Sequence, residues 1–308
     1  MKRFLTFLGL ISIVLSSHAV EPRSYEFAVI GNDTLRMDVY MPDDTCAAHP
    51  AVLFAFGGGF THGKRNDSHY TEYFNTLADN GIVAISTDYR TTLAKDPQKL
   101  TSADGFAQAL TGAISDAVSD FYTATCYILQ NAEQIRVDTG KIIASGSSAG
   151  AITALQAEYG LRNGQAAGIF PQEFNYAGVI SFAGAIFSSG SMYWQNKSCP
   201  MLLFHGDADR NVPYDRLSAG PVSLCGSATI ARSLASQAVP CEFYSFAGAD
   251  HVIATSPMTD NLYDILGFVK RVAEGKETLT INAVVTKPGA TVNTAPVFSI
   301  EDYIKANM

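Results

Sequence analysis

Short runs of apolar and β-branched residues alternate with helical stretches over most of this chain, and this alternation restricts its fold more than any other feature. Most of the apolar runs are almost continuously hydrophobic, which is typical of strands buried on both faces of a sheet. Such strands are expected at residues 51–56, 82–86, 141–144, 177–182, 201–204 and 242–246, with an earlier, antiparallel strand at 35–40. Helices are expected at residues 69–80, 104–134, 149–159, 230–237 and 260–273. The pattern predicts an α/β fold, a mainly parallel, doubly wound sheet with helices on both faces.

The 308 residues contain no internal repeat, low-complexity tract or clear linker, so we expect a single domain over residues 20–308. A chain of this length buries roughly three quarters of the surface that it exposes when unfolded, which allows a substantial core and an active site. Residues 275–308 are expected to extend this domain with a hairpin and a short helix, because Thr, Val and Ala surround a Lys-Pro-Gly turn there.

The first residues have the pattern of an export signal. Lys2 and Arg3 precede an apolar run at residues 4–15, and Ser17 and Ala19 are small residues at the two positions that a signal peptidase inspects. The alternative, a membrane anchor, is disfavoured because the run is shorter than the ~20 residues that a spanning helix needs. We therefore expect residues 1–19 to be a cleavable signal peptide. The protein is expected to be secreted or periplasmic, without stable insertion into a membrane.

Charge and cysteine content exclude several classes of partner. The net charge is −8, and the 21 Lys and Arg residues are scattered, whereas nucleic-acid binding needs a clustered basic surface. The 5 cysteines contain no Cys-x-x-Cys pair and have no His at metal-ligand spacing, so a zinc site is not expected. An oxidising compartment would permit disulfides, but their pairing cannot be deduced from one sequence. The cysteines are Cys46, Cys126, Cys199, Cys225 and Cys241, of which Cys126, in the long helical pattern, is expected to be a buried thiol.

The strongest local motif is Gly-Ser-Ser-Ala-Gly at residues 146–150, between an expected strand and an expected helix. A serine in such a tight strand-to-helix turn needs glycines two residues before and after it, because side chains there would collide with the backbone. The turn projects the hydroxyl group of Ser148 above the sheet and predicts a nucleophile. The alternative is a glycine-rich turn that happens to contain serine.

A second motif, Phe-Gly-Gly-Gly-Phe at residues 56–60, follows the strand expected at 51–56. Consecutive glycines allow main-chain N–H groups to point into a cavity, where they can stabilise the negative oxygen of a tetrahedral intermediate. The expected donors are the amides of Gly58, Gly59 and Ala149. A flexible loop without such a function is the alternative reading of three glycines.

A serine nucleophile needs a base, and the base needs a carboxylate that holds its tautomer. Asp207 and Asp209 share the loop after the strand at 201–204, and His251 follows the next strand. The order Ser, Asp, His along the chain is that of a doubly wound hydrolase. Asp209 is favoured over Asp207 by its place in the motif, and His205 is expected to brace the loop.

These motifs, together with Asp88-Tyr89-Arg90, occur over residues 50–271 in the same order as in the α/β-hydrolase superfamily. The chain therefore resembles this superfamily, in particular its carboxylesterases and hormone-sensitive-lipase-like esterases. The resemblance implies the α/β-hydrolase fold, with Ser148 as nucleophile, Asp209 as triad acid and His251 as general base. It also implies an oxyanion hole formed by Gly58, Gly59 and Ala149. The sequence departs from the family pattern at Phe56, where many of these esterases have His, and at residues 91–94, where Pro-Glu is usual.

Other side chains are candidates for substrate contact or for structural roles. Aromatic residues at loop positions can line a cleft, and they are just as often core residues. The candidates for substrate binding are Phe60, Tyr193 and Trp194. His62 and His69 are expected to be solvated surface residues, and Asp88 and Arg90 are expected to pair with each other beneath the site.

The sequence as a whole predicts a secreted serine carboxylesterase that acts on small or carbohydrate-linked esters of the acetyl or feruloyl type, through an acyl-enzyme on Ser148. No segment is long enough to form a large lid, which favours accessible ester substrates, and the reaction needs no metal or organic cofactor. Two alternatives remain. One is a prolyl-oligopeptidase-like serine exopeptidase, although Ala151 stands where that family usually has glycine. The other is a catalytically inactive binding protein with the same fold.

Overall fold

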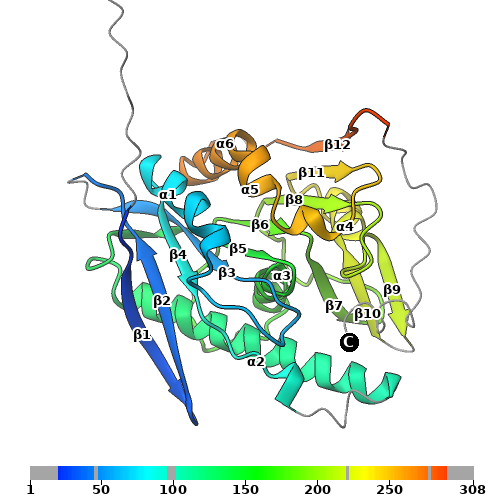
Figure 1. Cartoon of the computed structure of the whole chain (residues 1–308), viewed down its shortest axis with the longest axis horizontal. Helices are drawn as coiled ribbons and strands as arrows, with labels where there is room; N and C mark the ends of the chain where they lie inside the picture. The colour runs from blue at the N-terminus through cyan, green and yellow to red at the C-terminus, as the bar shows by residue number, and fades with distance from the viewer. Residues whose placement is uncertain (1–19, 45–47, 96–101, 220–221, 277–278, 290–308) are drawn as a thin grey trace, which may run out of the picture.

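The central feature of the computed structural model is a nine-stranded sheet with the order β1-β2-β4-β3-β5-β6-β8-β11-β12 (Figure 1). The structure describes residues 20–44, 48–95, 102–219, 222–276 and 279–289, so the signal peptide expected at 1–19 lies outside the described residues. The strands are β1 (Arg23–Ile30), β2 (Asp33–Tyr40), β3 (His49–Ala55), β4 (Val83–Thr87), β5 (Val137–Ser147), β6 (Gly178–Phe182), β8 (Met201–Gly206), β11 (Cys241–Phe246) and β12 (Ile281–Val285). Neighbouring strands from β4 to β12 in the sheet order are parallel. At the other edge, β1 pairs with β2 and β2 pairs with β4 in the antiparallel orientation.

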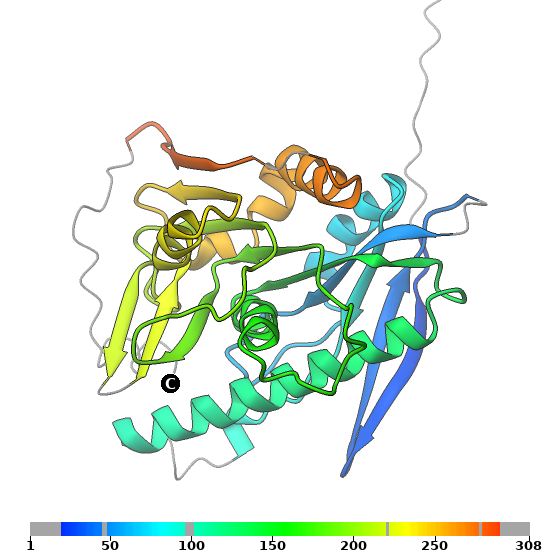
Figure 2. The ribbon, with the colours of Figure 1, turned by 180° about the vertical axis from the view of Figure 1, so that it is seen from behind.

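Helices cover both faces of the sheet, as the alternating sequence pattern predicts. They are α1 (Thr71–Asp79), α2 (Ala103–Gln130), α3 (Ala149–Arg162), α4 (Ser227–Ser236), α5 (Pro257–Asp260) and α6 (Leu262–Ala273). Figures 1 and 2 show α2 and α3 on one face and α1 and α6 on the other. Every residue of β4, β6 and β8 is buried, which explains why these strands are almost continuously hydrophobic. The α/β prediction is confirmed.

One part of the fold differs from the sequence-based expectation, and another is described only in part. In the segment expected as a C-terminal hairpin, the described residues include one strand, β12, which pairs in parallel with β11 at the edge of the sheet. The remainder of that extension, residues 290–308, lies outside the described residues, so the hairpin and the short helix stay predictions. The loop expected after β6 begins as a strand, β7 (Ala185–Ser189), of a separate antiparallel sheet with β10 (Val222–Gly226) and β9 (Arg216–Ala219). These pairings join segments distant in sequence, so local pattern does not reveal them.

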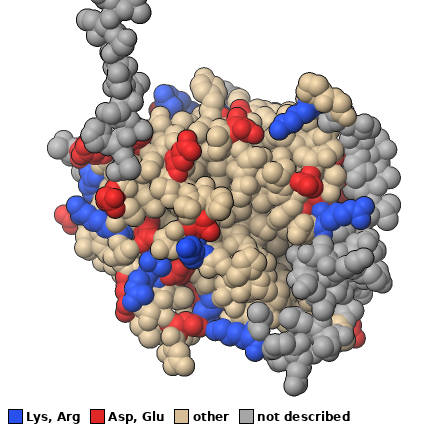
Figure 3. Space-filling model, in the orientation of Figure 1, with Lys and Arg blue, Asp and Glu red and all other residues tan. Residues whose placement is uncertain are grey.

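The surface and the cysteines add two further observations. Acidic and basic side chains are interspersed on the face shown in Figure 3, and Arg36 of β2 pairs with Glu26 of β1 at 3.1 Å. The cysteines within the described ranges are free thiols, and Cys126 is half-buried rather than fully buried. Cys46 lies outside those ranges. No helix in the described part of the chain is both long and apolar enough to cross a bilayer.

Candidate active site

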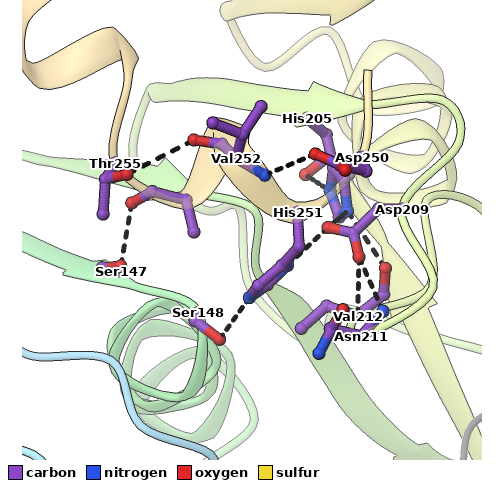
Figure 4. Close-up of polar contacts among 12 residues, drawn as sticks. Ser147, Ser148, His205, Asp209, Asn211, Val212, Asp250, His251, Val252 and Thr255 are labelled. Atoms are coloured by element: carbon purple, nitrogen blue, oxygen red, sulfur yellow. Dashed lines mark hydrogen bonds and ion pairs between the residues drawn. The ribbon is translucent and has the colours of Figure 1, made fainter. Parts of the chain in front are cut away.

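The site lies where parallel strands end at one edge of the sheet. The glycine loop follows β3, Ser148 follows β5, Asp209 follows β8 and His251 follows β11. Because these strands are parallel, their carboxyl ends meet at the same edge, and segments distant in sequence come together there (Figure 4).

Ser148 occupies a strained turn that only glycine neighbours permit. Its backbone has φ 52° and ψ −118°, outside the ordinary regions for residues other than glycine. A Cβ atom on Gly146 would lie 2.3 Å from the carbonyl carbon of Gly150, and one on Gly150 would lie 2.0 Å from the carbonyl oxygen of Ala55. The serine N–H donates to the carbonyl oxygen of Phe182 at 2.9 Å. Close backbone contacts therefore account for both glycines of the motif.

Ser148, His251 and Asp209 form a continuous hydrogen-bonded relay (Figure 4). The Oγ atom of Ser148 is 2.8 Å from Nε2 of His251, and Nδ1 of the same ring is 2.7 Å from Oδ2 of Asp209. Asp209 is buried, whereas the side chain of His251 is 24% exposed. With Nδ1 protonated and donating to the carboxylate, Nε2 is free to accept the serine proton.

The surroundings of Asp209 keep its carboxylate ionised. Burial favours the neutral acid, but hydrogen bonds from His205 and His251 outweigh it, so the pKa of Asp209 lies well below its ordinary value. Oδ1 also accepts the backbone N–H groups of Asn211 at 2.8 Å and Val212 at 3.0 Å. The carboxylate is thus fixed on one side by the loop and faces His251 on the other.

The neighbouring candidates in this loop have other partners. Asp207 accepts the backbone N–H of Gly248 at 2.6 Å and so braces the turn before His251. His205 is buried, with Nδ1 2.8 Å from Oγ of Ser227 and Nε2 3.4 Å from Oδ2 of Asp209. The structure therefore places Asp209, not Asp207, against the ring of His251, and it places His205 behind the carboxylate.

The glycine loop after β3 presents backbone amides beside Ser148. Gly58 has φ 135° and Gly59 has φ 60°, and a Cβ atom on Gly58 would lie 2.1 Å from the carbonyl oxygen of His62. Within the described part of the chain, the amides of Gly58 and Gly59 donate no hydrogen bond. Ala149 is the first residue of α3, where N–H groups have no intrahelical acceptor. The arrangement suits these three amides to a negatively charged oxygen.

Comparison with known proteins agrees with this geometry. The BD-FAE family model, an esterase-like α/β-hydrolase domain, matches residues 37–186, which include the glycine loop and Ser148. The apo form of esterase 2 from Thermogutta terrifontis superposes with a TM-score of 0.59 at 22% identity, over 84% of this chain and 96% of that chain. The chain has the α/β-hydrolase fold, and its residues 37–186 are similar to the BD-FAE family.

Two further structures of the Thermogutta terrifontis enzyme match this chain equally well. The propionate-bound form has a TM-score of 0.59 and 22% identity, over 84% of this chain and 94% of that chain. The form phosphonylated by sarin has a TM-score of 0.59 and 21% identity, over 84% and 96% of the respective chains. At this level of identity, the likeness establishes the shared fold.

A cavity of about 780 Å³ opens above Ser148. Ser148, His251 and the glycine loop line it, together with His62 and Phe106. His62 is an exposed residue at this cavity, with Nδ1 2.8 Å from Oγ1 of Thr61. His69 does not line the cavity.

The expectation that Tyr193 and Trp194 bind substrate does not agree with their positions. Trp194 is buried, packs edge-on against Tyr159 with ring centroids 4.9 Å apart, and donates from Nε1 to Oγ of Ser233 at 3.2 Å. Tyr193 is exposed, and neither residue lines the cavity. Tyr159 lies eleven positions after Ser148 along α3, which corresponds to roughly 16 Å of helix. The loop therefore covers the far end of α3.

The expected ion pair between Asp88 and Arg90 is also wrong, because each residue has a different partner. Asp88 binds Nη1 of Arg65 at 2.9 Å, and Arg90 binds Asp120 at 2.8 Å. Asp120, on α2, is buried, so the second pair ties the segment after β4 to this helix.

Tyr70 and Tyr89 support the glycine loop, a role that the sequence pattern does not indicate. The hydroxyl oxygen of Tyr70 accepts the N–H of Gly57 at 3.2 Å, and Tyr70 also lines the cavity. Tyr89 donates to the carbonyl oxygen of Phe56 at 2.8 Å and stacks on its ring at 4.4 Å. Tyr89 belongs to the Asp-Tyr-Arg motif, which is a weak signal, whereas nothing local marks Tyr70.

Proposed function

We propose that this protein is an exported carboxylesterase that hydrolyses small or carbohydrate-linked esters, of the acetyl or feruloyl type, through an acyl-enzyme on Ser148. The observation that carries the proposal is the relay from Ser148 through His251 to Asp209, which lies at an open cavity of about 780 Å³. Export rests on the signal-peptide pattern of residues 1–19.

Acylation begins when Oγ of Ser148 attacks the ester carbonyl carbon and Nε2 of His251 takes the serine proton. The carbonyl electrons move onto oxygen, which the amides of Gly58, Gly59 and Ala149 stabilise. The carboxylate of Asp209 stabilises the imidazolium that forms. The tetrahedral intermediate then collapses, the bond to the alcohol oxygen breaks, and His251 gives its proton to that oxygen.

Deacylation repeats these steps with water. Nε2 of His251 takes a proton from water as the water oxygen attacks the acyl carbon. The same amides hold the second oxyanion, and its collapse breaks the bond to Oγ of Ser148. The proton on His251 returns to Oγ, and a carboxylic acid leaves. The cycle consumes one water molecule and restores the relay.

The surroundings of the relay support small, accessible esters. The cavity is open to solvent and carries polar groups from Thr61, Asp67, Asn211 and Thr255, which suit a hydroxylated alcohol. Structures of the Thermogutta terrifontis esterase hold propionate and butyrate, and this protein has the same fold. A short acyl group is therefore a reasonable substrate component.

An activity-based probe tests the proposal directly. A fluorophosphonate should label the wild-type protein, and Ser148→Ala should lose the label. Ser147→Ala is the matched control, because the Oγ atom of Ser147 donates to the carbonyl oxygen of Ala254 and the variant should still be labelled. A panel of aryl acetates, methyl ferulate, acetylated xylan and dipeptide amides then separates an esterase from a peptidase. An unlabelled wild-type protein would indicate a binding protein and overturn the proposal.

The export part of the proposal has its own measurement. Expression in a host with a secretory pathway should yield a mature protein whose mass lacks residues 1–19. Replacing apolar residues of 4–15 with charged ones should keep the full-length chain inside the cell. Recovery of uncleaved wild-type protein from the cytoplasm would contradict export without affecting the proposed chemistry.

A further inference from the structure

A second, much smaller cavity adjoins the glycine loop. Its apolar walls are the side chains of Phe60, Leu93, Phe106, Leu110 and Ile152, and we call it the small cavity. Three of these side chains come from helices, since Phe106 and Leu110 lie one turn apart on α2 and Ile152 lies on α3. The other two wall residues, Phe60 and Leu93, are joined by a hydrogen bond. The carbonyl oxygen of Phe60 accepts the backbone N–H of Leu93 at 3.1 Å.

The small cavity lies beside the proposed oxyanion hole. The backbones of Gly59 and Ala149, whose amides face the developing oxyanion in the proposed reaction, also line it. Ile152 follows Ser148 by four residues, and its backbone N–H donates to the carbonyl oxygen of Ser148 at 2.9 Å. Gly59, Leu93 and Phe106 line the large cavity as well. The two cavities therefore adjoin each other at these three residues.

The two cavities differ greatly in size. The small cavity offers about 10 Å³, which is close to the least space that a single water molecule needs, whereas the large cavity offers about 780 Å³. The small cavity thus has room for one methyl-sized group. The five apolar side chains that enclose it are buried, and buried side chains of this kind resist displacement.

We propose that the small cavity is the acyl subsite and that it makes this enzyme selective for acetyl esters, with Leu110 as a specificity-determining residue. The inference rests on the proposed function and narrows it, because a feruloyl group is far too large for this subsite. The acetyl methyl group enters the small cavity, the carbonyl oxygen faces the glycine-loop amides, and the alcohol occupies the large polar cavity. Of the five wall residues, Phe60, Leu110 and Ile152 line the small cavity without lining the large one, and Leu110 is the one of these three that lies on α2.

Chain-length profiles test this assignment. The kcat/KM values of 4-nitrophenyl acetate, propionate, butyrate and ferulate are compared, because these esters share one leaving group. The kcat/KM of the wild-type enzyme should be about tenfold or more higher for acetate than for butyrate. Each methylene that does not fit a pocket lowers kcat/KM by a factor of about this size. Leu110→Ala should raise the butyrate-to-acetate ratio by about tenfold. Ile114→Ala, one turn further along α2 and also buried, should leave the ratio unchanged.

Leu110→Val provides a milder enlargement if the alanine variant does not fold, and it should shift the preference toward propionate. The proposal is overturned if wild-type enzyme hydrolyses butyrate or ferulate as fast as acetate. It is also overturned if neither Leu110 variant changes the ratio. Failure of the proposed function looks different, because no ester would then be hydrolysed and Ser148 would not be labelled.

Discussion

Oδ2 of Asp209 lies 2.7 Å from Nδ1 of His251, and this contact joins a buried carboxylate to a partly exposed imidazole. Replacing the carboxylate by an amide in Asp209→Asn leaves the size unchanged but favours the wrong tautomer of the ring. We expect kcat for 4-nitrophenyl acetate to fall by about 10⁴-fold, as in other enzymes with this relay. Steady-state kinetics of the purified variant measure the loss.

Asp207→Asn is the matched control, because Asp207 is two residues away and binds the backbone of Gly248 rather than the ring. Its kcat should stay within about tenfold of the wild-type value. A comparable loss in both variants would contradict the assignment of Asp209 as the triad acid.

The pKa of Asp209 also predicts how stability depends on pH. Because the folded protein holds this pKa well below its ordinary value, the ionised carboxylate stabilises the fold. The contribution is fully present above the unfolded pKa of about 3.9 and is lost as pH falls through the lower, folded pKa. The difference in unfolding free energy between wild type and Asp209→Asn should therefore be constant from about pH 5 to 7 and shrink below about pH 4. Urea titrations across this range would contradict the sign if the difference grew in acid.

The sequence is most informative where local backbone geometry decides the residue type. The clash between a Cβ atom on Gly150 and the carbonyl oxygen of Ala55 explains why the motif around Ser148 is recognisable from its residues alone. The buried parallel strands are recognisable for a similar reason, because burial on both faces requires continuous apolar runs. The ends of these strands then indicate Asp209 and His251.

Features that depend on tertiary packing are not predictable from the sequence. Trp194 could lie in a cleft or in the core, and only the path of its loop over α3 decides between them. Strand β12 is short and half exposed, and it pairs with β11 at a distance along the chain. Arg90 binds Asp120 on a helix thirty residues later, and the sequence has no pattern that connects the two. The contact of Tyr70 with the glycine loop is hidden for the same reason.

The glycines around Ser148 should be essential for folding. In Gly150→Ala the new methyl group would lie 2.0 Å from the carbonyl oxygen of Ala55, so strand β3 or helix α3 must shift. We expect a loss of about 3 kcal/mol in unfolding free energy, measured by urea denaturation. Gly112→Ala on α2 meets no atom within 4 Å and should stabilise the protein by about 0.5–1 kcal/mol. Equal stabilities of the two variants would show that the turn is not tightly packed.

The hydroxyl group of Tyr70 should contribute to the rate by positioning the glycine loop. Its oxygen accepts the N–H of Gly57, the residue before the two proposed oxyanion donors, so Tyr70→Phe leaves this amide without its acceptor. We expect kcat to fall by about tenfold with little change in KM, because a displaced loop weakens stabilisation of the transition state more than substrate binding. Tyr127→Phe is the control and should retain the wild-type kcat, because Tyr127 is a half-buried residue of α2 that does not line the cavity. A reduced stability without a reduced kcat in Tyr70→Phe would assign the hydroxyl to folding instead.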